Sequence, residues 1–213
     1  SFLDFGEGGI TFAATSGITF AAWVRVDSIQ ENGHILCLRD DGDANYIKLH
    51  HHDTTRRAKL SIKNDGAGAY ALLTPDPGAG AGERDPRWFF PPAPAAGSDG
   101  PWLHVAATAT AGSEGESRMA LFRDGATLES TEADNADDEP NGWTRVGGTA
   151  PNPSIPGTTY TRAALGRNDD GAGADYFDGA LRDVRLYARA LSSGEVAALA
   201  AATAPPAWAA AAA

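Results

Sequence analysis

The sequence predicts an all-β fold, an antiparallel β-sandwich that ends in one short C-terminal helix. Short runs rich in β-branched and aromatic residues recur along the chain, and Gly, Asp, Asn or Pro bounds each of them. Several runs alternate apolar and polar residues, as strands with one buried face do. A helical pattern is almost absent before residue 192. Many short strands with little helix are typical of two packed antiparallel sheets.

The alternation is clearest in Ile18–Val26, where Phe20 and Val24 share one face and Trp23 and Arg25 share the other. Tyr46–Leu49 alternates in the same way. Such alternation indicates strands that pack against a core, and it does not indicate a binding or catalytic site. The expected strands, in order, are Phe2–Phe5, Ile10–Phe12, Ile18–Val26, His34–Arg39, Tyr46–His51, Ala58–Lys63, Trp102–Thr108, Arg118–Arg123, Leu128–Thr131, Tyr160–Leu165 and Phe177–Tyr187.

Two local signals predict a turn and a helix. Asp124 and Gly125 lie between strand-like runs, and Asp-Gly favours the positive φ angles of a type I′ hairpin turn. Ser192 and Glu195 have the spacing of a capping box, in which each side chain accepts from the other residue's backbone N–H. The helix that follows should end at Pro205-Pro206.

Several of these segments carry a family resemblance. Residues 177–187 read FDGALRDVRLY and lead into the capping box. This resembles the F-x-G-x-(I/L)-D-(E/D)-V-R-(I/L)-Y strand and A-L-S-x-x-E helix of the laminin-G-like branch of the concanavalin A-like lectin/glucanase superfamily. Residues 3–6, 18–26, 101–106 and 122–125 are similar to further motifs of that family. The resemblance implies jelly-roll connectivity.

Because the resemblance spans the whole chain, we expect one domain over residues 1–204 and an Ala-rich tail over 205–213. Residues 74–100 and 133–159 form two Pro-rich loops that look longer than the family's usual connections. Loops of this length without secondary structure are commonly functional or disordered.

Composition excludes some classes of partner. The net charge is −11, whereas nucleic-acid binding needs a basic surface that neutralises phosphates. No segment has the roughly 20 apolar residues of a membrane span. Cys37 is the one cysteine, so no intrachain disulfide can form, and its apolar run indicates a buried thiol. The chain begins at Ser1, and we expect a secreted, extracellular or organelle-lumen protein after removal of an upstream targeting segment.

Two acidic turns are candidate calcium sites, because clustered carboxylate and amide oxygens suit Ca²⁺. Asp-Gly turns are also common without any metal, so plain solvated turns are the alternative. The candidate metal ligands are Asp40, Asp41, Asp43, Asp169, Asp170 and Asp175.

The resemblance implies a structural calcium held by an aspartate in the last long strand. Arg182 occupies that position here, and Asp183 takes the place of the following acid. An arginine cannot ligate a cation, so this family site requires Asp183 or Asp178 instead.

The histidine run has a metal-binding and a structural interpretation. His50 and His52 would share one face of a strand and could reach one ion. The run precedes a polar turn, however, and we expect solvated residues at a hairpin tip.

Catalysis lacks its usual signatures. Glucanases on this fold carry alternating carboxylates, E-x-D-x-E, on one strand, because retaining hydrolysis needs two carboxyl groups about 5 Å apart. No expected strand has that pattern. A nucleophile elbow, a phosphate loop and an H-E-x-x-H motif are also absent. The sequence therefore predicts a protein that is not an enzyme.

Aromatic residues in the long loops are the candidate contact surface. Trp88, Phe89 and Phe90 follow Arg87, and Trp143 lies in the second loop. Three consecutive aromatics should leave at least one exposed to a sugar ring or a protein. The alternative is that the loop folds back over a sheet edge or an apolar face.

We therefore expect a non-catalytic module that binds carbohydrate or a glycosylated partner through its rim loops. The alternative is an accessory or scaffolding subunit that makes protein contacts through its Pro-rich loops. A glycan-active hydrolase is a third hypothesis.

Overall fold

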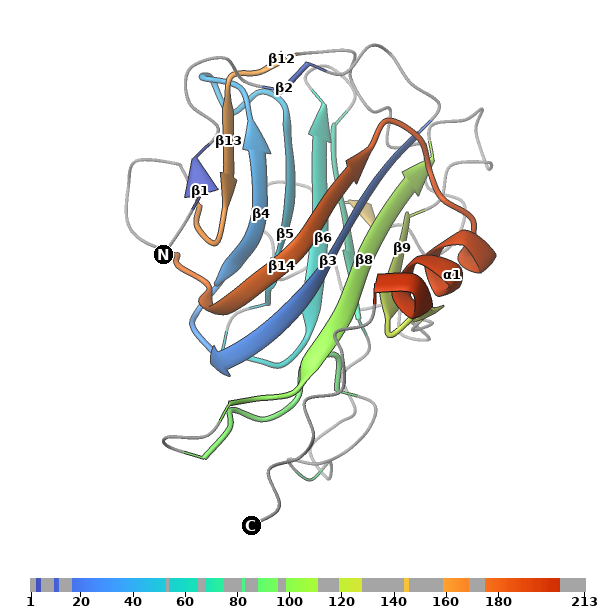
Figure 1. Cartoon of the computed structure of the whole chain (residues 1–213). Helices are drawn as coiled ribbons and strands as arrows, with labels where there is room; N and C mark the ends of the chain where they lie inside the picture. Colours follow the sequence, from blue (N-terminus) through green and yellow to red (C-terminus); the bar gives the residue numbers. More distant parts are fainter. Residues whose placement is uncertain are drawn as a thin grey trace.

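The computed structural model describes residues 3–4, 10–11, 17–52, 54–64, 68–74, 82, 88–95, 99–110, 119–127, 144–145, 159–168 and 175–203. Two antiparallel sheets pack face to face as a sandwich, which confirms the expected all-β jelly roll (Figure 1). One sheet has the order β1 (Leu3–Asp4), β13 (Arg162–Leu165), β4 (His34–Arg39), β5 (Tyr46–His51), β6 (Ala58–Asn64), β7 (Gly68–Leu73) and β11 (Thr144–Arg145). The other has the order β10 (Ala126–Thr127), β9 (Met119–Arg123), β8 (Trp102–Thr110), β3 (Gly17–Ser28) and β14 (Asp178–Tyr187).

A short pair, β2 (Ile10–Thr11) and β12 (Thr159–Tyr160), lies beside the two sheets. Within the described residues, the pairing of β11 with β7 is parallel, and every other strand pair is antiparallel. The sequence did not predict β7 or β11. Residues 68–73 are Gly- and Ala-rich, with low strand propensity, and pairing with β6 decides their conformation.

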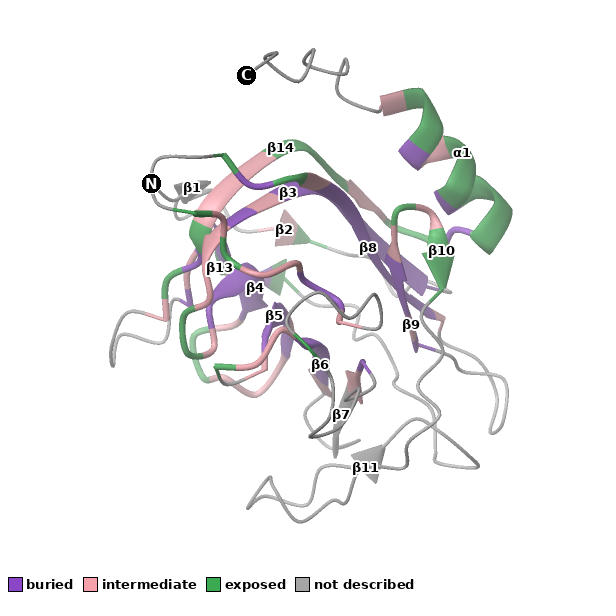
Figure 2. Ribbon diagram, turned by 90° about the horizontal axis from the view of Figure 1, so that it is seen from below, coloured by how far each residue is buried: buried purple, intermediate pink, exposed green. Residues whose placement is uncertain are grey.

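The core lies between the sheets and follows the period-two alternation. Ile18, Phe20, Ala22, Val24 and Val26 of β3 all belong to it, as expected. Facing residues of β4, β5 and β6 complete it from the seven-stranded sheet. Figure 2 looks along the layers and shows the buried stretches of both sheets facing one another.

Phe89 and Phe90 fold back into this core, which was the alternative to their exposure and removes these two from the predicted contact residues. Phe89 and Phe90 are fully buried core residues, with ring centroids 4.8 Å apart, so they cannot contact a ligand. The Phe90 amide donates to the Arg56 carbonyl (2.9 Å), and the Arg123 guanidinium donates to the Trp88 carbonyl. The loop therefore closes the sandwich, because its apolar rings gain more from burial than from exposure.

The expected hairpin and helix are both confirmed. Asp124 and Gly125 join β9 to β10 with φ angles of 53° and 82°. The strand expected at 128–131 lies outside the described residues, and β10 pairs directly after the turn. Helix α1 (Ser193–Thr203) follows the capping box, with Ser192 N donating to Glu195 Oε2 (2.8 Å) and Glu195 N donating to Ser192 Oγ (3.3 Å).

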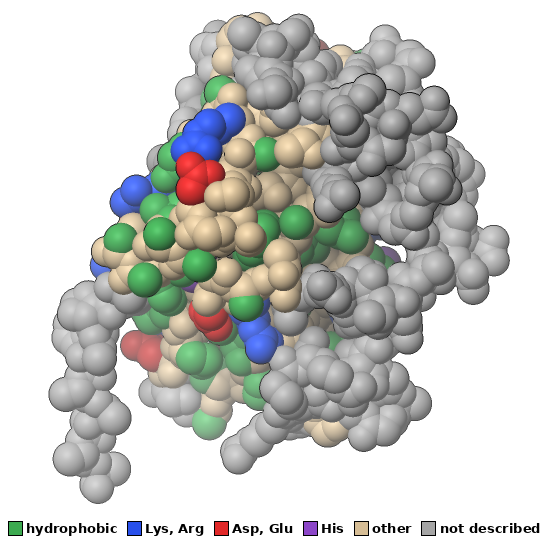
Figure 3. Space-filling view, turned by 90° about the vertical axis from the view of Figure 1, so that its right-hand side faces the viewer, with side chains coloured by type: hydrophobic (Ala, Val, Ile, Leu, Met, Phe, Trp, Pro, Cys, Tyr) green, Lys and Arg blue, Asp and Glu red, His purple; other side chains and the backbone are tan. Residues whose placement is uncertain are grey.

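Helix α1 packs on the outside of the five-stranded sheet (Figure 2). A second apolar cluster, which includes Ala21, Phe122 and Val196, joins the helix to β3 and β9. Trp23 of β3 donates its indole N–H to Thr203 Oγ1, at the end of the helix, at 2.9 Å. Viewed from the right-hand side of Figure 1, the described surface carries few charged side chains (Figure 3).

Candidate functional site

The outer face of the seven-stranded sheet carries five of the ten Lys and Arg residues that lie in the described strands. Ile47 and Leu49 of β5, and Leu60 and Ile62 of β6, point into the core. Their alternate neighbours therefore point outward. All three lysines of the chain are on this side, in a protein of net charge −11. We name the following five residues the basic face: Arg39, Tyr46, Lys48, Lys63 and Arg162.

Four of these residues form one row across four strands. Arg162 of β13 is directly opposite Arg39 of β4, Arg39 is opposite Tyr46 of β5, and Tyr46 is opposite Lys63 of β6. Residues directly opposite one another have Cβ atoms about 5 Å apart, and like charges at that spacing are unfavourable. The adjacent arginines therefore need counter-charges.

Tyr46 lies between two ammonium groups. Lys48 Nζ is 4.6 Å and Lys63 Nζ is 5.8 Å from its ring centroid, within the range of cation–π attraction. The tyrosine is only 5% exposed, whereas both lysines are partly exposed. Its ring therefore positions the two cations and is not itself an open stacking platform.

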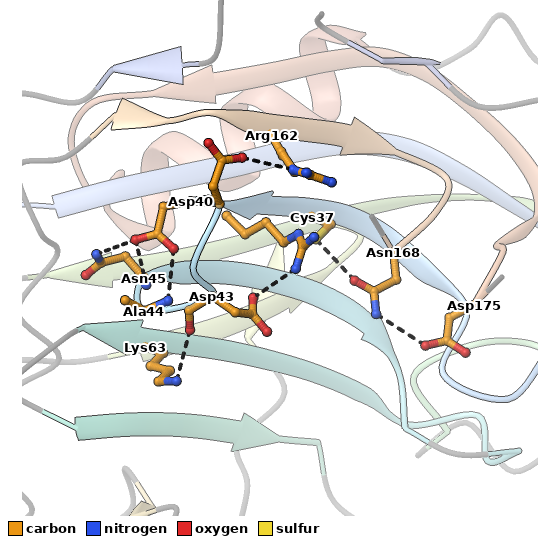
Figure 4. Close-up of polar contacts among 11 residues, drawn as sticks. Cys37, Asp40, Asp43, Ala44, Asn45, Lys63, Arg162, Asn168 and Asp175 are labelled. Atoms are coloured by element: carbon orange, nitrogen blue, oxygen red, sulfur yellow. Dashed lines mark hydrogen bonds and ion pairs between the residues drawn. The ribbon is translucent and has the colours of Figure 1, made fainter. Parts of the chain in front are cut away.

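The first acidic turn, residues 40–45, borders this row, and its first carboxylate holds the turn together (Figure 4). Asp40 accepts from the backbone N–H groups of Ala44 (2.9 Å) and Asn45 (3.1 Å) and from Asn45 Nδ2 (2.7 Å). An aspartate that caps its own backbone in this way is a common turn device.

The other two carboxylates of the turn pair with the two arginines. Asp41 Oδ1 accepts from Arg162 Nε at 3.1 Å, and this hydrogen bond is the main reason that the pKa of Asp41 is lowered. Asp43 Oδ1 lies 3.5 Å from Arg39 Nη1. Lys63 Nζ donates to the Asp43 carbonyl at 2.9 Å, so the turn touches three of the four cations.

Arg39 is the most enclosed of these cations. Its side chain is 7% exposed, and its Nε finds no hydrogen-bond acceptor in the part of the chain that the structure describes. A buried donor without an acceptor carries a desolvation cost, and this cost is larger for charged groups. The row therefore contains donor capacity that the turn uses only in part.

Among the described residues, no group of three His, Cys, Asp or Glu side chains is placed to hold a metal ion. Each carboxylate of the first turn is engaged as above, and Asp169 and Asp170 lie outside the described residues. Asp175 Oδ2 accepts from Asn168 Nδ2 at 3.4 Å, and Asn168 Oδ1 accepts from the buried Cys37 thiol (Figure 4). Calcium at these turns stays a prediction.

The charged side chains of the last strand, β14, contact other groups of the protein. The Arg182 guanidinium lies 5.9 Å from the Trp102 ring centroid, and Asp183 accepts two hydrogen bonds from Arg185. Asp178 accepts from Ser28 Oγ at 2.5 Å. Both acids that could replace the family's aspartate are thus engaged with protein groups.

The histidine run is buried, so the expected solvated tip is wrong for two of its members. His50 stacks on His34, with centroids 4.6 Å apart and planes 16° apart. His51 points the other way, against Phe90 at 4.3 Å. Burial lowers the pKa of His50 well below its usual value and that of His51 to about 4. Both rings fill space as neutral imidazoles, on opposite sides of the sheet.

Of the remaining predicted contact residues, the structure describes Trp88 alone. Arg87 and Trp143 lie outside the described residues. Trp88 is half-buried, with the Arg56 guanidinium 4.7 Å from its ring centroid and its indole N–H on the Gly82 carbonyl at 3.3 Å.

Sequence reasoning missed the basic face. The available signal was the alternation of residues 46–49 and 58–63, in which all three lysines take the positions that alternate with core residues.

Comparison with known proteins identifies the family. A sequence profile described as the Concanavalin A-like lectin/glucanases superfamily matches residues 4–197. The chain therefore belongs to this superfamily, as its laminin-G-like motifs indicated. A search of curated protein sequences found no match. Among the described residues, no helix is both long and apolar enough to cross a bilayer.

Solved structures share the fold at low sequence identity. The native heptameric SAP-like pentraxin from Limulus polyphemus is 13% identical, with a TM-score of 0.54 over 93% of this chain and 74% of that one. The Ruminococcus gnavus IT-sialidase CBM40 bound to α2,6 sialyllactose is 14% identical, with a TM-score of 0.54 over 93% and 96%. The binding domain of Botulinum neurotoxin DC, in complex with rat synaptotagmin II, is 9% identical, with a TM-score of 0.52 over 89% and 36%.

Proposed function

We propose that this protein is a non-catalytic carbohydrate-recognition module and that the basic face is its ligand-binding site. The observation that carries the proposal is the placement of all three lysines, with Arg39 and Arg162, on one sheet face of an otherwise acidic chain. Clustered cations of this kind concentrate donors and positive potential on one surface. Arg162 is exposed and both Lys48 and Lys63 are partly exposed, so a ligand can reach them.

The fold supports the carbohydrate class. A carbohydrate-binding module with the same architecture has been solved with sialyllactose, and it matches this chain over nearly its whole length. This likeness concerns the fold, and the basic face of this chain supplies the residue-level argument.

The chemistry of the described strands favours binding over hydrolysis. No described strand carries two carboxylates at alternate positions, the arrangement that glycosidic cleavage on one strand would use. The acids nearest the basic face, Asp41 and Asp43, are ion-paired with arginines. Asp41 is a poor general acid, because the hydrogen bond from Arg162 lowers the pKa of its carboxyl group.

The accessory-subunit alternative rests on the long Pro-rich loops, most of which lie outside the described residues. Of the aromatic residues in these loops, Phe89 and Phe90 are part of the core. Trp88 keeps a partly exposed ring beside Arg56 and remains the residue through which a partner could bind the rim. We place the protein in a secreted, extracellular or lumenal compartment, where glycans are displayed.

A glycan array followed by isothermal titration calorimetry tests the proposal. The double variant Lys48→Gln, Lys63→Gln should lose about tenfold or more in affinity for any saccharide that binds, because charge-assisted donors disappear. The control is Arg189→Gln, which removes an exposed cation on the five-stranded side, where it pairs with Glu195. If no saccharide binds, or if both variants bind like the parent protein, the proposal is wrong.

A further inference from the structure

We infer that the basic face selects an acidic saccharide group, a carboxylate or a sulfate, and that Asp41 and Asp43 are built-in competitors which this group displaces from Arg162 and Arg39. This inference rests on the proposed function. It specifies the class of ligand that the basic face binds and the two aspartates that compete with that ligand. The acidic turn then acts as an internal substitute for the ligand, occupying the two guanidinium groups while the site is empty.

The row of cations requires an anion. Arg162 and Arg39 are cross-strand neighbours, and Lys63 lies one strand beyond Tyr46 in the same row. Such a row is unfavourable by itself, because the like charges lie close together. Two carboxylates from one turn relieve the repulsion. The Asp41 side chain is 71% exposed, and that of Asp43 is 44% exposed although its Oδ1, the atom that faces Arg39, is buried.

The Asp41–Arg162 pair is suited to exchange. Both side chains are solvent-exposed, at 71% and 43%, and exposed ion pairs of this kind contribute little to stability. A ligand carboxylate or sulfate that approaches the same guanidinium therefore meets a weak competitor. Rotation of the Asp41 side chain is enough to free Arg162 without unfolding the turn, because Asp40 holds the turn by three separate hydrogen bonds.

Arg39 supplies the independent observation. Its side chain is more than nine-tenths buried, its contact with Asp43 is long at 3.5 Å, and its Nε has no acceptor within the described chain. Strong guanidinium–carboxylate pairs are shorter, about 2.7–2.9 Å, and use two parallel hydrogen bonds. Asp43 thus leaves part of the hydrogen-bonding capacity of Arg39 unused. A carboxylate or sulfate that presents two oxygens to the guanidinium offers the better geometry.

The experiment measures affinity by calorimetry for matched acidic and neutral saccharides. One arm compares sialyllactose with lactose, which isolates a carboxylate. The second compares a sulfated heparin oligosaccharide with its desulfated form, which isolates a sulfate. Asp41→Asn should strengthen binding of the acidic member about two- to fivefold. Arg162→Gln should weaken it about tenfold, and added salt should weaken it further.

The matched control is Asp27→Asn, which removes an acid paired with Arg25 on the other sheet at 2.9 Å and changes the net charge equally. If both aspartate variants bind the acidic saccharide more tightly than the parent protein, the effect comes from overall charge and the inference is wrong. Weaker binding by Asp41→Asn would make Asp41 a positioning residue rather than a competitor. Equal affinity for the neutral and acidic members of each pair would contradict selectivity for acidic saccharides and leave glycan binding intact. If no saccharide binds at all, the proposed function itself is wrong.

Discussion

Folding changes the ionisation of several buried imidazoles. His51 packs between Phe90 and Phe177, and its pKa falls to about 4 because burial removes water from the charged form. Burial also lowers the pKa values of His50 and His104. All three rings are therefore neutral in the folded chain at pH values where the unfolded chain has begun to protonate them.

This difference predicts acid sensitivity. Between pH 6.5 and about 4, the unfolded state binds a proton at His51 that the folded state does not, so the free energy of unfolding rises with pH. Stability is complete above pH 6.5 and falls as the pH drops toward 4, with about 3 kcal/mol lost through His51. Urea unfolding at several pH values measures the slope. His51→Leu should reduce that slope by about one proton, and an unchanged slope would contradict the assignment.

At the scale of elements, the last strand of the five-stranded sheet explains a motif. Gly179 is the glycine of the F-x-G pattern, and a Cβ at this position would lie 2.1 Å from the Arg25 carbonyl oxygen and 2.6 Å from the Phe177 ring. The glycine therefore permits the close approach of β14 to β3. Farther along, Asp183 has a φ of 48° in a bulge that bends β14, and its carboxylate accepts two hydrogen bonds from Arg185.

Gly179→Ala should lower the free energy of unfolding by about 2 kcal/mol or more, because the clash involves backbone that cannot give way easily. Thermal and urea unfolding measure the loss. Gly194→Ala is the control within α1, where a Cβ meets nothing within 4 Å. It should be neutral or stabilise by about 0.5 kcal/mol. Equal effects of the two substitutions would refute the close-packing explanation.

At the scale of the whole molecule, the two sheets have separate uses. The interior joins both sheets, Phe89 and Phe90 into one core. The outside of the five-stranded sheet carries α1, and the outside of the seven-stranded sheet carries the basic face (Figures 2 and 4). Stability and recognition should therefore be separable by mutation.

Phe90→Ala should destabilise the protein by about 3–5 kcal/mol, because it leaves a cavity among fully buried aromatic groups. Saccharide affinity of the folded fraction should be unchanged, since Phe90 lies inside the sandwich and the basic face lies outside. Unfolding curves and calorimetry on the same sample test both parts. A large loss of affinity without loss of stability would restore Phe90 as a contact residue.

Much of the fold could be predicted from the sequence, whereas little of the candidate site could. The alternation in β3, the Asp124-Gly125 turn and the Ser192 capping box each depend on residues a few positions apart. Phe89 and Phe90 illustrate the opposite case. Their exposure depended on where a Pro-rich loop met the core, and three adjacent aromatics give no local signal for that.

By itself, the sequence determined the alternation of strand residues, the helix cap and the family. Local backbone preference and alternation depend on neighbouring residues alone. Only the tertiary structure decided that Arg162, Arg39, Tyr46 and Lys63 stand in one row and that two aspartates of a single turn neutralise its arginines. Residues 39 and 162 are far apart in the chain. Cross-strand register, which the packing of both sheets sets, is what brings their charges together.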